Sequence, residues 1–362
     1  MKNISLYIIL FATLITFSCG DENESHSQRI LPGGKIPSKL YVLDIQPDLS
    51  WHQRNMLTCF QGLINRKDTR IYYVETEQDR FWLDYYKETF HIENEKVSNI
   101  NDLLKRFSNE INGYITYQPD NPHTLNIATT IGSLENLLPV SPDQERLMQE
   151  IGLKKKKEVE DYGDDRIEIY KKAMKELLPK CNQNLLAALC VHHPHWPTST
   201  VLNKDYVMAH NIFSFDLSSS ERDKRDYNLV REIYSSVEEG AVIMGWHCVR
   251  DKEHEAIGLS SEYGHFGMCS LHTPNLTVHS SIPLPEGKIF TQRTIDKQKL
   301  KVEDKVYIAY MATDGDASWF MNDLVKTDWT DPARGNFKYN WGFLPLAYDL
   351  MPGTVKYSPD NT

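Results

Sequence analysis

Short apolar runs alternate with amphipathic segments along the first half of the chain. Apolar residues at helical spacing predict helices at residues 50–65, 79–90, 101–107, 142–153 and 166–178. Short runs rich in β-branched and aromatic residues predict strands at residues 40–45, 70–74, 113–117 and 185–191. Alternation of strands and helices at this spacing favours a parallel sheet with helices on its faces, and residues 126–130 with residues 139–140 continue this alternation. The sequence shows no internal repeat.

A polar stretch at residues 198–206 predicts a domain boundary, after which the alternation resumes. Strands are expected at residues 212–217, 240–246, 276–280, 306–312 and 339–344, and helices at 226–237, 253–261 and 346–350. Three of these strands end on polar groups, His247, His279 and Asp314, as strands do at the active face of a β/α barrel. The predicted fold class is therefore α/β, with a parallel-sheet α/β domain at residues 38–205 and a β/α-barrel-like domain at residues 206–362.

The stretch from Lys305 to Trp329 combines a predicted buried strand with acidic residues. Val306–Ala312 carries no charge, and Asp314 and Asp316 follow it on either side of a glycine. A helix is expected next, so both carboxylates would lie at the carboxyl edge of a sheet, where ligands bind in α/β proteins. The alternative is structural, with Asp316 as a helix cap and Asp314 as a turn residue. The spacing does not match a calcium-binding EF-hand loop, because Trp319 replaces its glycine and Val325 its glutamate.

Composition narrows the possible functions. The chain has 362 residues and a formal net charge of −10, and it has no basic stripe interleaved with aromatic residues, which argues against nucleic acid as a partner. The cysteines beyond Cys19 have neither disulfide-framework nor zinc-site spacing. The run His192-His193-Pro194-His195 is interpreted as a loop between domains. No phosphate-binding loop, serine-hydrolase elbow or HExxH motif occurs, and neither a cofactor nor a metal is expected.

The N-terminus has the pattern of a targeting segment. Lys2 precedes the apolar run Ile4–Phe17, which is too short to span a bilayer as a mature anchor. Ser18-Cys19-Gly20 follows and resembles the lipobox of bacterial lipoproteins, in which the cysteine is lipidated. Residues 1–19 are thus expected to be a signal peptide, Cys19 a lipid anchor to the membrane, and residues 20–37 a flexible tether. The expected location is the outer membrane, facing the cell surface or the periplasm, with plain secretion as the alternative.

Several segments together resemble the GxGYxYP family of glycoside hydrolase-like proteins, which are secreted bacterial proteins with two domains. They occur in the family's order from Leu40 onward and read QGLINR (Gln61–Arg66), VIMGW (Val242–Trp246), SSEYG (Ser260–Gly264), NLTVHSS (Asn275–Ser281), TDGD (Thr313–Asp316) and NWGFLP (Asn340–Pro345). The signature that names the family would follow residues 352–361, but the sequence stops at Thr362. The resemblance therefore implies a C-terminally truncated second domain with an exposed sheet edge, through which the protein could self-associate.

The resemblance implies a carbohydrate substrate or ligand. Hydrolysis of a glycosidic bond needs one protonated and one ionised carboxyl group, and the candidates are Asp314, Asp316 and Glu262. Aromatic faces and polar groups that could bind a sugar are Trp246, His247, Asn275, His279, Trp319 and Trp341. Gln61 and Asn65 share one helix face and could reach a ligand between the domains. Each of these residues also has an ordinary structural interpretation, in the core, at a cap or on the surface.

Two alternatives remain open at this stage. The protein could bind carbohydrate without turning it over, or be an inactive remnant, because the family signature is missing. Alternatively, Asp314 or Asp316 could join His247 and His279 in a metal site for a deacetylase-like hydrolysis. The second alternative lacks a histidine motif at tight spacing.

Overall fold

The computed structural model describes residues 31–159, 162–191, 203–246, 248, 250–270, 273–284, 298, 300–312, 321–323, 329–337, 339–341 and 344–360. Residues 31–362 group into one unit by their contacts. The predicted signal peptide, the lipidation site Cys19 and the first part of the tether lie outside the described residues. Within the part of the chain that is described, no helix has the length and apolar character needed to cross a membrane.

The first sheet is built from three parallel strands in the order β2-β1-β3. Its elements are β1 (Lys39–Asp44), α1 (Trp51–Asn65), β2 (Ile71–Val74), α2 (Glu77–Phe90) and β3 (Glu93–Lys96), followed by α3 (Ile100–Phe107). Local chemistry sets where α1 begins, because the side chains of Ser50 and Gln53 form a reciprocal capping box with the backbone.

The second sheet has the order β5-β4-β6 and is also parallel. Its elements are β4 (Gly113–Thr116), α4 (His123–Glu135), β5 (Leu137–Val140), α5 (Glu145–Glu150) and β6 (Lys155–Glu158), followed by α6 (Arg166–Glu176). Strands β4 and β5 are buried along their whole length, whereas β6 is a charged, exposed edge strand. A charged edge strand discourages pairing with other chains.

The third sheet has four parallel strands in the order β10-β9-β7-β8. Its elements are β7 (Leu185–Ala188), α7 (Lys204–Ala209), β8 (Phe213–Phe215), α8 (Lys224–Ser235), β9 (Val242–Gly245), α9 (Glu253–Glu262) and β10 (Phe266–Cys269). The rest of the described chain contains α10 (Leu276–His279), the parallel pair β11 (Met311–Ala312) and β12 (Asn340–Trp341), and the helices α12 (Ala347–Leu350) and α13 (Pro352–Asp360).

The three sheets repeat one topology. In each, the first strand in the sequence lies between the second and the third, and a helix connects the first strand to the second. The expectation of no internal repeat therefore holds for the sequence but is wrong for the fold. The same backbone path can be built from unrelated side chains, because burial requires apolar residues at the right period and not particular residues.

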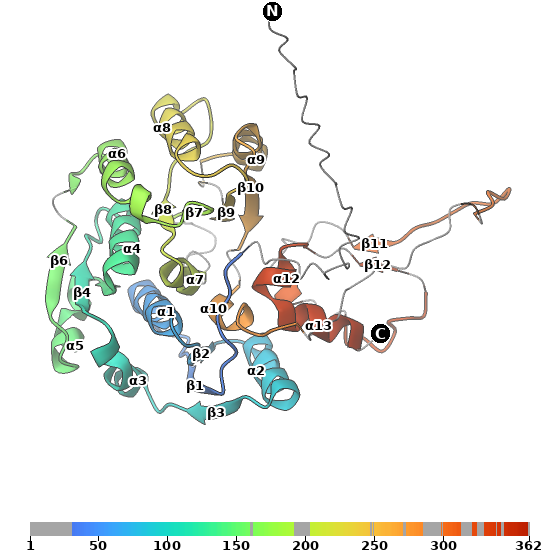
Figure 1. Ribbon diagram of the computed structural model, residues 1–362, viewed down its shortest axis with the longest axis horizontal. Coiled ribbons are helices and arrows are strands. Elements are labelled where there is room, and N and C mark those ends of the chain that lie inside the picture. The colour runs from blue at the N-terminus through green and yellow to red at the C-terminus, as the bar shows by residue number, and fades with distance from the viewer. Residues whose placement is uncertain are drawn as a thin grey trace, which may run out of the picture. The chain divides into compact units, whose positions relative to one another are not determined.

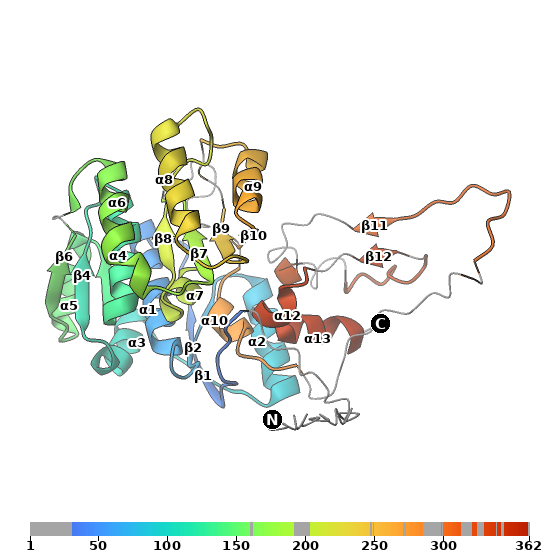
Figure 2. The ribbon, with the colours of Figure 1, turned by 45° about the horizontal axis from the view of Figure 1, so that its top comes forward.

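The connecting helices α1, α4 and α7 pack together (Figure 1). Helix α1 packs on α7 and on β5 of the second sheet, and α4 packs on α7 and on β8 of the third sheet. Figure 2 shows the same three helices from another side. The approach of α1 to α7 depends on Gly62, because a Cβ atom there would lie 2.2 Å from the carbonyl oxygen of Asp205. The connecting helices of the first and second repeats thus each cover a strand of the next sheet in the sequence.

The predicted parallel α/β class is confirmed, and the barrel-like arrangement of the second domain stays a prediction. Strand β7 precedes the expected boundary at residues 205 and 206, yet it pairs with β8 and β9, which follow that boundary. The boundary therefore falls inside one sheet.

One predicted strand is wrong, because residues 276–279 form helix α10. Residues 126–130 lie within α4 and residues 139 and 140 within β5, so they continue the alternation of helices and strands. The predicted buried strand at residues 306–312 is also corrected, because only Met311 and Ala312 pair as a strand and Val306 is 89 % exposed. Apolar alternation alone cannot tell a buried strand from an exposed one, since burial depends on what packs against it.

Candidate functional site

Asp216 occupies the carboxyl edge of the third sheet, immediately after β8. Its side chain is buried, with 8 % exposed. The oxygen Oδ2 accepts a hydrogen bond of 3.2 Å from the backbone N–H of Val191, and the side chain of Cys248 also hydrogen-bonds to the carboxyl group. Burial raises the pKa of Asp216, and the nearby His123 works against that rise. Asp216 is therefore a strand-end carboxyl group whose surroundings favour the protonated form.

His123 is the first residue of α4 and lies beyond the carboxyl end of β4. Its Nδ1 atom is 3.3 Å from the hydroxyl of Tyr170, and the two rings meet edge to face with centroids 5.6 Å apart. Burial lowers the pKa of His123, and Arg166 and Arg250 add to the effect, although Asp216 opposes it. The imidazole is thus favoured in its neutral form next to Asp216.

Tyr170 on α6 connects these two groups. Its hydroxyl oxygen accepts hydrogen bonds of 3.1 Å from the backbone N–H of Asp216 and from Nδ2 of Asn126. The ring itself is buried. One hydroxyl therefore fixes the backbone that carries Asp216 and contacts the imidazole of His123.

An ion-pair network centred on the buried Asp226 holds the chain around this edge. Asp226 on α8 is fully buried and accepts hydrogen bonds from Arg166 at 3.0 Å and 3.2 Å and from Arg250 at 2.5 Å. It also accepts one of 3.0 Å from the backbone N–H of Ser218. These contacts join α6, α8 and the segment after β9. Removing the arginines would leave a buried carboxylate without a charged partner, which is destabilising, so Asp226 has a structural role here.

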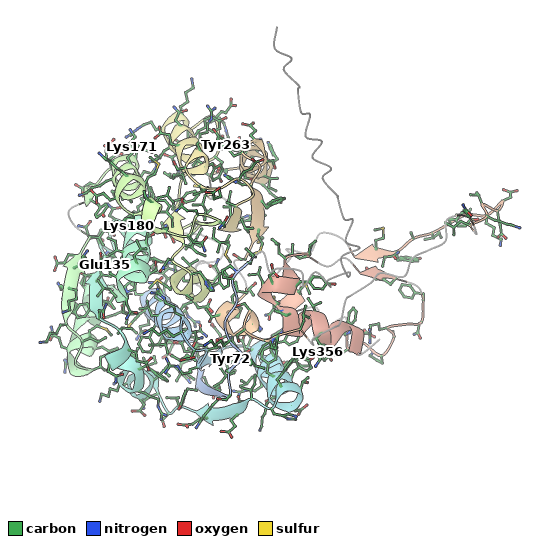
Figure 3. All side chains as sticks on the ribbon, viewed as in Figure 1. Tyr72, Glu135, Lys171, Lys180, Tyr263 and Lys356 are labelled. Atoms are coloured by element: carbon green, nitrogen blue, oxygen red, sulfur yellow. The ribbon has the colours of Figure 1, made fainter. Side chains whose placement is uncertain are left out.

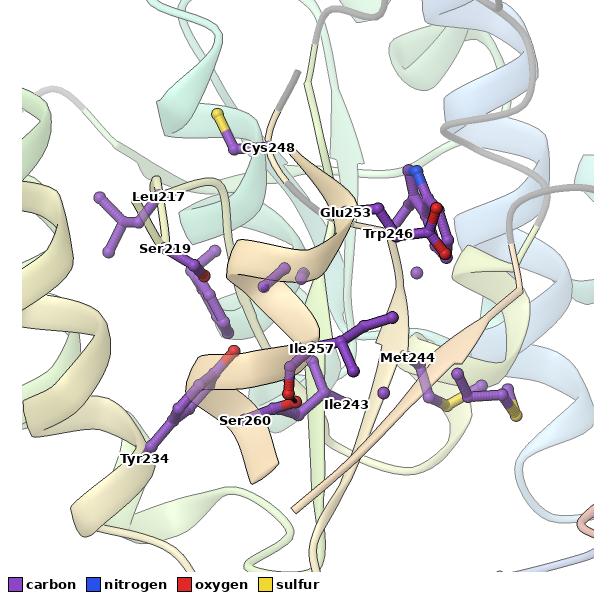
Figure 4. A pocket seen from close by; sticks show the side chains of 16 residues that line it. Leu217, Ser219, Tyr234, Ile243, Met244, Trp246, Cys248, Glu253, Ile257 and Ser260 are labelled. Atoms are coloured by element: carbon purple, nitrogen blue, oxygen red, sulfur yellow. Dashed lines mark hydrogen bonds between the residues drawn. The ribbon is translucent and has the colours of Figure 1, made fainter. Parts of the chain in front are cut away.

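A small pocket lies between α9 and the third sheet, and Trp246 is among the residues that line it (Figure 4). Most of its lining is apolar, including Leu217, Ile243 and Ile257. Its volume is about 60 Å³. The predicted role of Trp246 in sugar binding stays a prediction.

Glu262 lies at the end of α9, which runs from the carboxyl end of β9 back toward the start of β10, so this residue lies at the amino edge of the sheet. Its side chain is exposed. Figure 3 labels the next residue, Tyr263, whose hydroxyl accepts a 2.9 Å hydrogen bond from Nε of Arg231. Glu262 is therefore on the opposite edge of the sheet from Asp216, and its catalytic role stays a prediction.

Gln61, Asn65 and Asn275 are buried where α1, β2 and the start of α10 meet. Nε2 of Gln61 donates to Oδ1 of Asn275 at 2.7 Å. Nδ2 of Asn65 donates to the hydroxyl of Thr277 at 3.0 Å, and its Oδ1 accepts from the backbone N–H groups of Arg70 and Ile71. The amide groups that sequence reasoning offered to a ligand are thus engaged in contacts within the protein.

His279 lies in α10, and its side chain is fully buried. Its Nδ1 is 2.6 Å from the hydroxyl of Tyr86, and burial lowers its pKa to about 3. The prediction that His279 stands at a strand end is therefore wrong, because this segment is helical and packs among the aromatic rings of Tyr72, Trp82 and Tyr86.

The remaining predicted site residues are not described in enough detail to place their side chains. Asp314, Asp316, Trp319 and His247 lie outside the described residues. Trp341 contributes its backbone to β12, but its side chain is not described. Among the residues that are described, no group of three or more histidine, cysteine, aspartate or glutamate side chains could hold a metal ion.

Sequence reasoning missed Asp216, His123 and Tyr170. The apolar pattern at residues 212–217 was interpreted as one strand running through Asp216, whereas β8 ends at Phe215. A strand-end carboxylate at that position was a signal that could have been found, since ligands bind at the carboxyl ends of parallel strands. His123 and Tyr170 could not have been connected to it, because the three residues belong to different parts of the chain.

Comparison with known proteins gave four family-model matches in order along the chain. They are the GxGYxYP_N first domain at residues 39–109, the second domain at residues 111–181, the GxGYxYP third domain at residues 188–281, and the "GxGYxYP putative glycoside hydrolase C-terminal domain" at residues 304–362. The first three follow the three structural repeats closely, although the third begins at the last residue of β7. No curated protein matches the chain.

One solved structure is similar, the crystal structure of a "putative hydrolase" from Bacteroides thetaiotaomicron. The sequences are 20 % identical, and the TM-score is 0.77. The match covers 91 % of this chain and 62 % of the other, so this chain spans less than two thirds of that protein's length. At this identity the likeness establishes a shared fold and nothing finer.

Proposed function

Because the chain belongs to the GxGYxYP family, we propose that it is a carbohydrate-active hydrolase that uses carboxyl groups at strand ends. The C-terminal family model carries a glycoside hydrolase name, and the similar solved structure carries a hydrolase title. The single observation from the molecule that supports this function is Asp216, a strand-end carboxyl group with a raised pKa.

Glycoside hydrolysis requires a protonated acid on one side of the bond and an ionised carboxylate on the other. Asp216 suits the role of the acid, because burial favours its protonated form. We propose Asp314 or Asp316 as the ionised partner on the strength of the sequence alone. Glu262 is a poorer candidate than the sequence indicated, because it lies at the amino edge of the sheet.

A raised carboxyl pKa can also result from burial in a purely structural network. What favours function here is the contrast with Asp226, whose oxygens accept from two arginines and a backbone N–H. The hydrogen-bond partners of Asp216 are instead the backbone N–H of Val191 and the side chain of Cys248, and among the described residues no arginine or lysine forms an ion pair with it.

The test is turnover of a panel of 4-nitrophenyl glycosides, together with reducing-end release from a mixture of bacterial and plant polysaccharides. Asp216→Asn should lower the rate about 100-fold or more, as expected when a general acid is removed. Asp314→Asn and Asp316→Asn should identify the second carboxylate. Glu262→Gln is the matched control and should stay close to wild type.

Three outcomes would overturn the proposal. Full activity in Asp216→Asn would remove Asp216 from the mechanism. Wild-type protein that binds the polysaccharides in affinity electrophoresis but hydrolyses none would favour the non-catalytic, carbohydrate-binding alternative. A rate restored by zinc after chelation would instead favour the metal-dependent alternative.

We also propose that the protein is a lipoprotein of the outer membrane, anchored through Cys19. Support comes from the sequence, in which Ser18-Cys19-Gly20 follows an apolar segment and precedes an acidic stretch. The full chain should therefore incorporate radiolabelled palmitate in a bacterial host, and Cys19→Ala should not. Equal labelling of both proteins would contradict the anchor.

A further inference from the structure

We propose that Tyr170 is a positioning residue that holds His123 in the neutral form protonated on Nε2, so that His123 presents an N–H donor to the ligand. The statement about the tautomer concerns the protein alone. The statement about the ligand rests on the proposed function, because it assumes that Asp216 and His123 face a bound carbohydrate.

The argument begins with the hydrogen-bonding capacity of the Tyr170 hydroxyl. A phenol oxygen has one proton to donate and two lone pairs that accept. The backbone N–H of Asp216 and the Nδ2 group of Asn126 both donate to this oxygen at 3.1 Å. Because these two donors occupy both lone pairs, the remaining contact, with Nδ1 of His123 at 3.3 Å, must use the hydroxyl proton. Nδ1 is then the acceptor, and a neutral ring carries its proton on Nε2.

The orientation of the Asn126 amide supports this assignment. Its Nδ2 group is also 3.1 Å from the carbonyl oxygen of Leu189, which can only accept. Turning the amide over would bring Oδ1 against that carbonyl, with no proton between the two oxygens. The backbone N–H of Asp216 cannot be turned over at all. The Asn126 amide nitrogen and the Asp216 backbone N–H can therefore only donate to the Tyr170 hydroxyl.

The charges around the imidazole are consistent with a neutral ring. Arg166 on α6 and Arg250 after β9 disfavour a second positive charge, while Asp216 after β8 and Asp226 on α8 favour one. Asp226 is already paired with both arginines. Burial lowers the pKa of His123, as the arginines do, and together these effects outweigh the two aspartates.

The consequence concerns the ligand atom that this edge can bind. With Nδ1 held by Tyr170, the opposite side of the ring offers only an N–H donor, and protonated Asp216 would offer an O–H donor. Two donors side by side suit an oxygen that accepts, such as a sugar hydroxyl or the oxygen of a glycosidic bond. His123 would then bind and polarise an oxygen and would not act as a general base.

The experiment is NMR spectroscopy of the full chain labelled with ¹⁵N-histidine, in which two-bond proton–nitrogen correlations distinguish the two tautomers. The signals of His123 are assigned by their loss in His123→Gln. In the wild-type protein we expect His123 to be protonated on Nε2 only. In Tyr170→Phe, we expect the tautomer protonated on Nδ1 to appear and the titration midpoint of His123 to rise, because the donor that competes with protonation of Nδ1 is gone.

Tyr162→Phe is the matched control, because the Tyr162 hydroxyl contacts the exposed Glu176 at 3.2 Å and does not touch His123. It should leave the His123 signals unchanged. A wild-type ring protonated on Nδ1 would overturn the proposal. Signals in Tyr170→Phe identical to those of wild type would also overturn it. Failure of the hydrolase proposal is a separate outcome. In that case the protein would show no turnover of glycosides, although the NMR spectrum showed His123 protonated on Nε2.

Discussion

The side-chain amide of Asn275 forms hydrogen bonds with both backbone groups of Tyr73. Oδ1 of Asn275 accepts from the Tyr73 N–H at 2.8 Å, and Nδ2 donates to the Tyr73 carbonyl at 2.8 Å. Tyr73 belongs to β2, an edge strand of the first sheet. The amide therefore pairs with the edge as a neighbouring strand would, and it leaves that residue no free backbone group for another chain. Asn275 also adopts φ of +57°, a conformation that asparagine tolerates better than most residues.

Replacing Asn275 by alanine should destabilise the protein strongly. The change removes both hydrogen bonds to Tyr73 and the one from Gln61, and it leaves buried backbone groups unpaired. We expect a loss of about 3 kcal/mol in the free energy of unfolding, measured by urea denaturation. The control is Asn228→Ala on the exposed face of α8, which should change stability by less than about 0.5 kcal/mol. Equal midpoints for the two variants would show that the amide does not stabilise this junction.

Asp205 on α7 should make stability depend on pH. Burial raises its pKa from 3.8 to about 6, although Thr277 donates to its Oδ2 through both N–H and hydroxyl. Between these two values the folded protein keeps the proton while the unfolded chain has released it. The free energy of unfolding should therefore fall as pH rises from about 4 to about 6, by about 3 kcal/mol at most.

The matched variant for this prediction is Asp205→Asn, which keeps an acceptor for Thr277 but cannot titrate. Urea denaturation at several values between pH 4 and pH 7 should give a flatter pH dependence for the variant. Asp79 and Asp216 also have raised pKa values and remain in both proteins, so some slope will persist. Parallel pH profiles for the two proteins would contradict the assignment.

The first helix could be predicted from the sequence because its signals are local. Ser50 caps α1 and Asn65 ends it, as expected from residues a few positions apart. Residues 276–279 could not be predicted, since their alternating pattern favours a strand, while Asn275 commits its side chain to β2 and the backbone turns into a helix. Prediction of the secondary structure fails here because a contact with a residue far away in the sequence overrides the local preference.

The candidate site was harder to predict than the fold. Asp216 was within reach of sequence reasoning, because strand ends carry sites, but its environment depends on Tyr170 and His123 from the preceding repeat. The polar residues chosen from the sequence, such as Gln61 and His279, have the right chemistry for a ligand and are buried in contacts between the first repeat and α10. Residue type indicates what a side chain can bind, whereas only packing decides whether it is free to do so.

We expect the protein to self-associate through the segment that leads into β11. Exposed large apolar side chains gather there, with Val302 94 %, Val306 89 % and Ile308 72 % exposed. Strands β11 and β12 pair with each other, and no third strand joins them among the described residues. An exposed apolar segment next to open strand edges favours pairing between chains.

Multi-angle light scattering should therefore detect an average mass that rises with protein concentration. The double variant Val306→Lys, Ile308→Lys should lower that mass, because charges on an exposed strand oppose pairing. Ile36→Lys is the matched control, since Ile36 is also exposed, at 45 %, but lies far from this segment in the sequence. A wild-type protein that stays monomeric at all concentrations would contradict the prediction. If the double variant associates as strongly as the wild-type protein, the contact between chains is made by another surface.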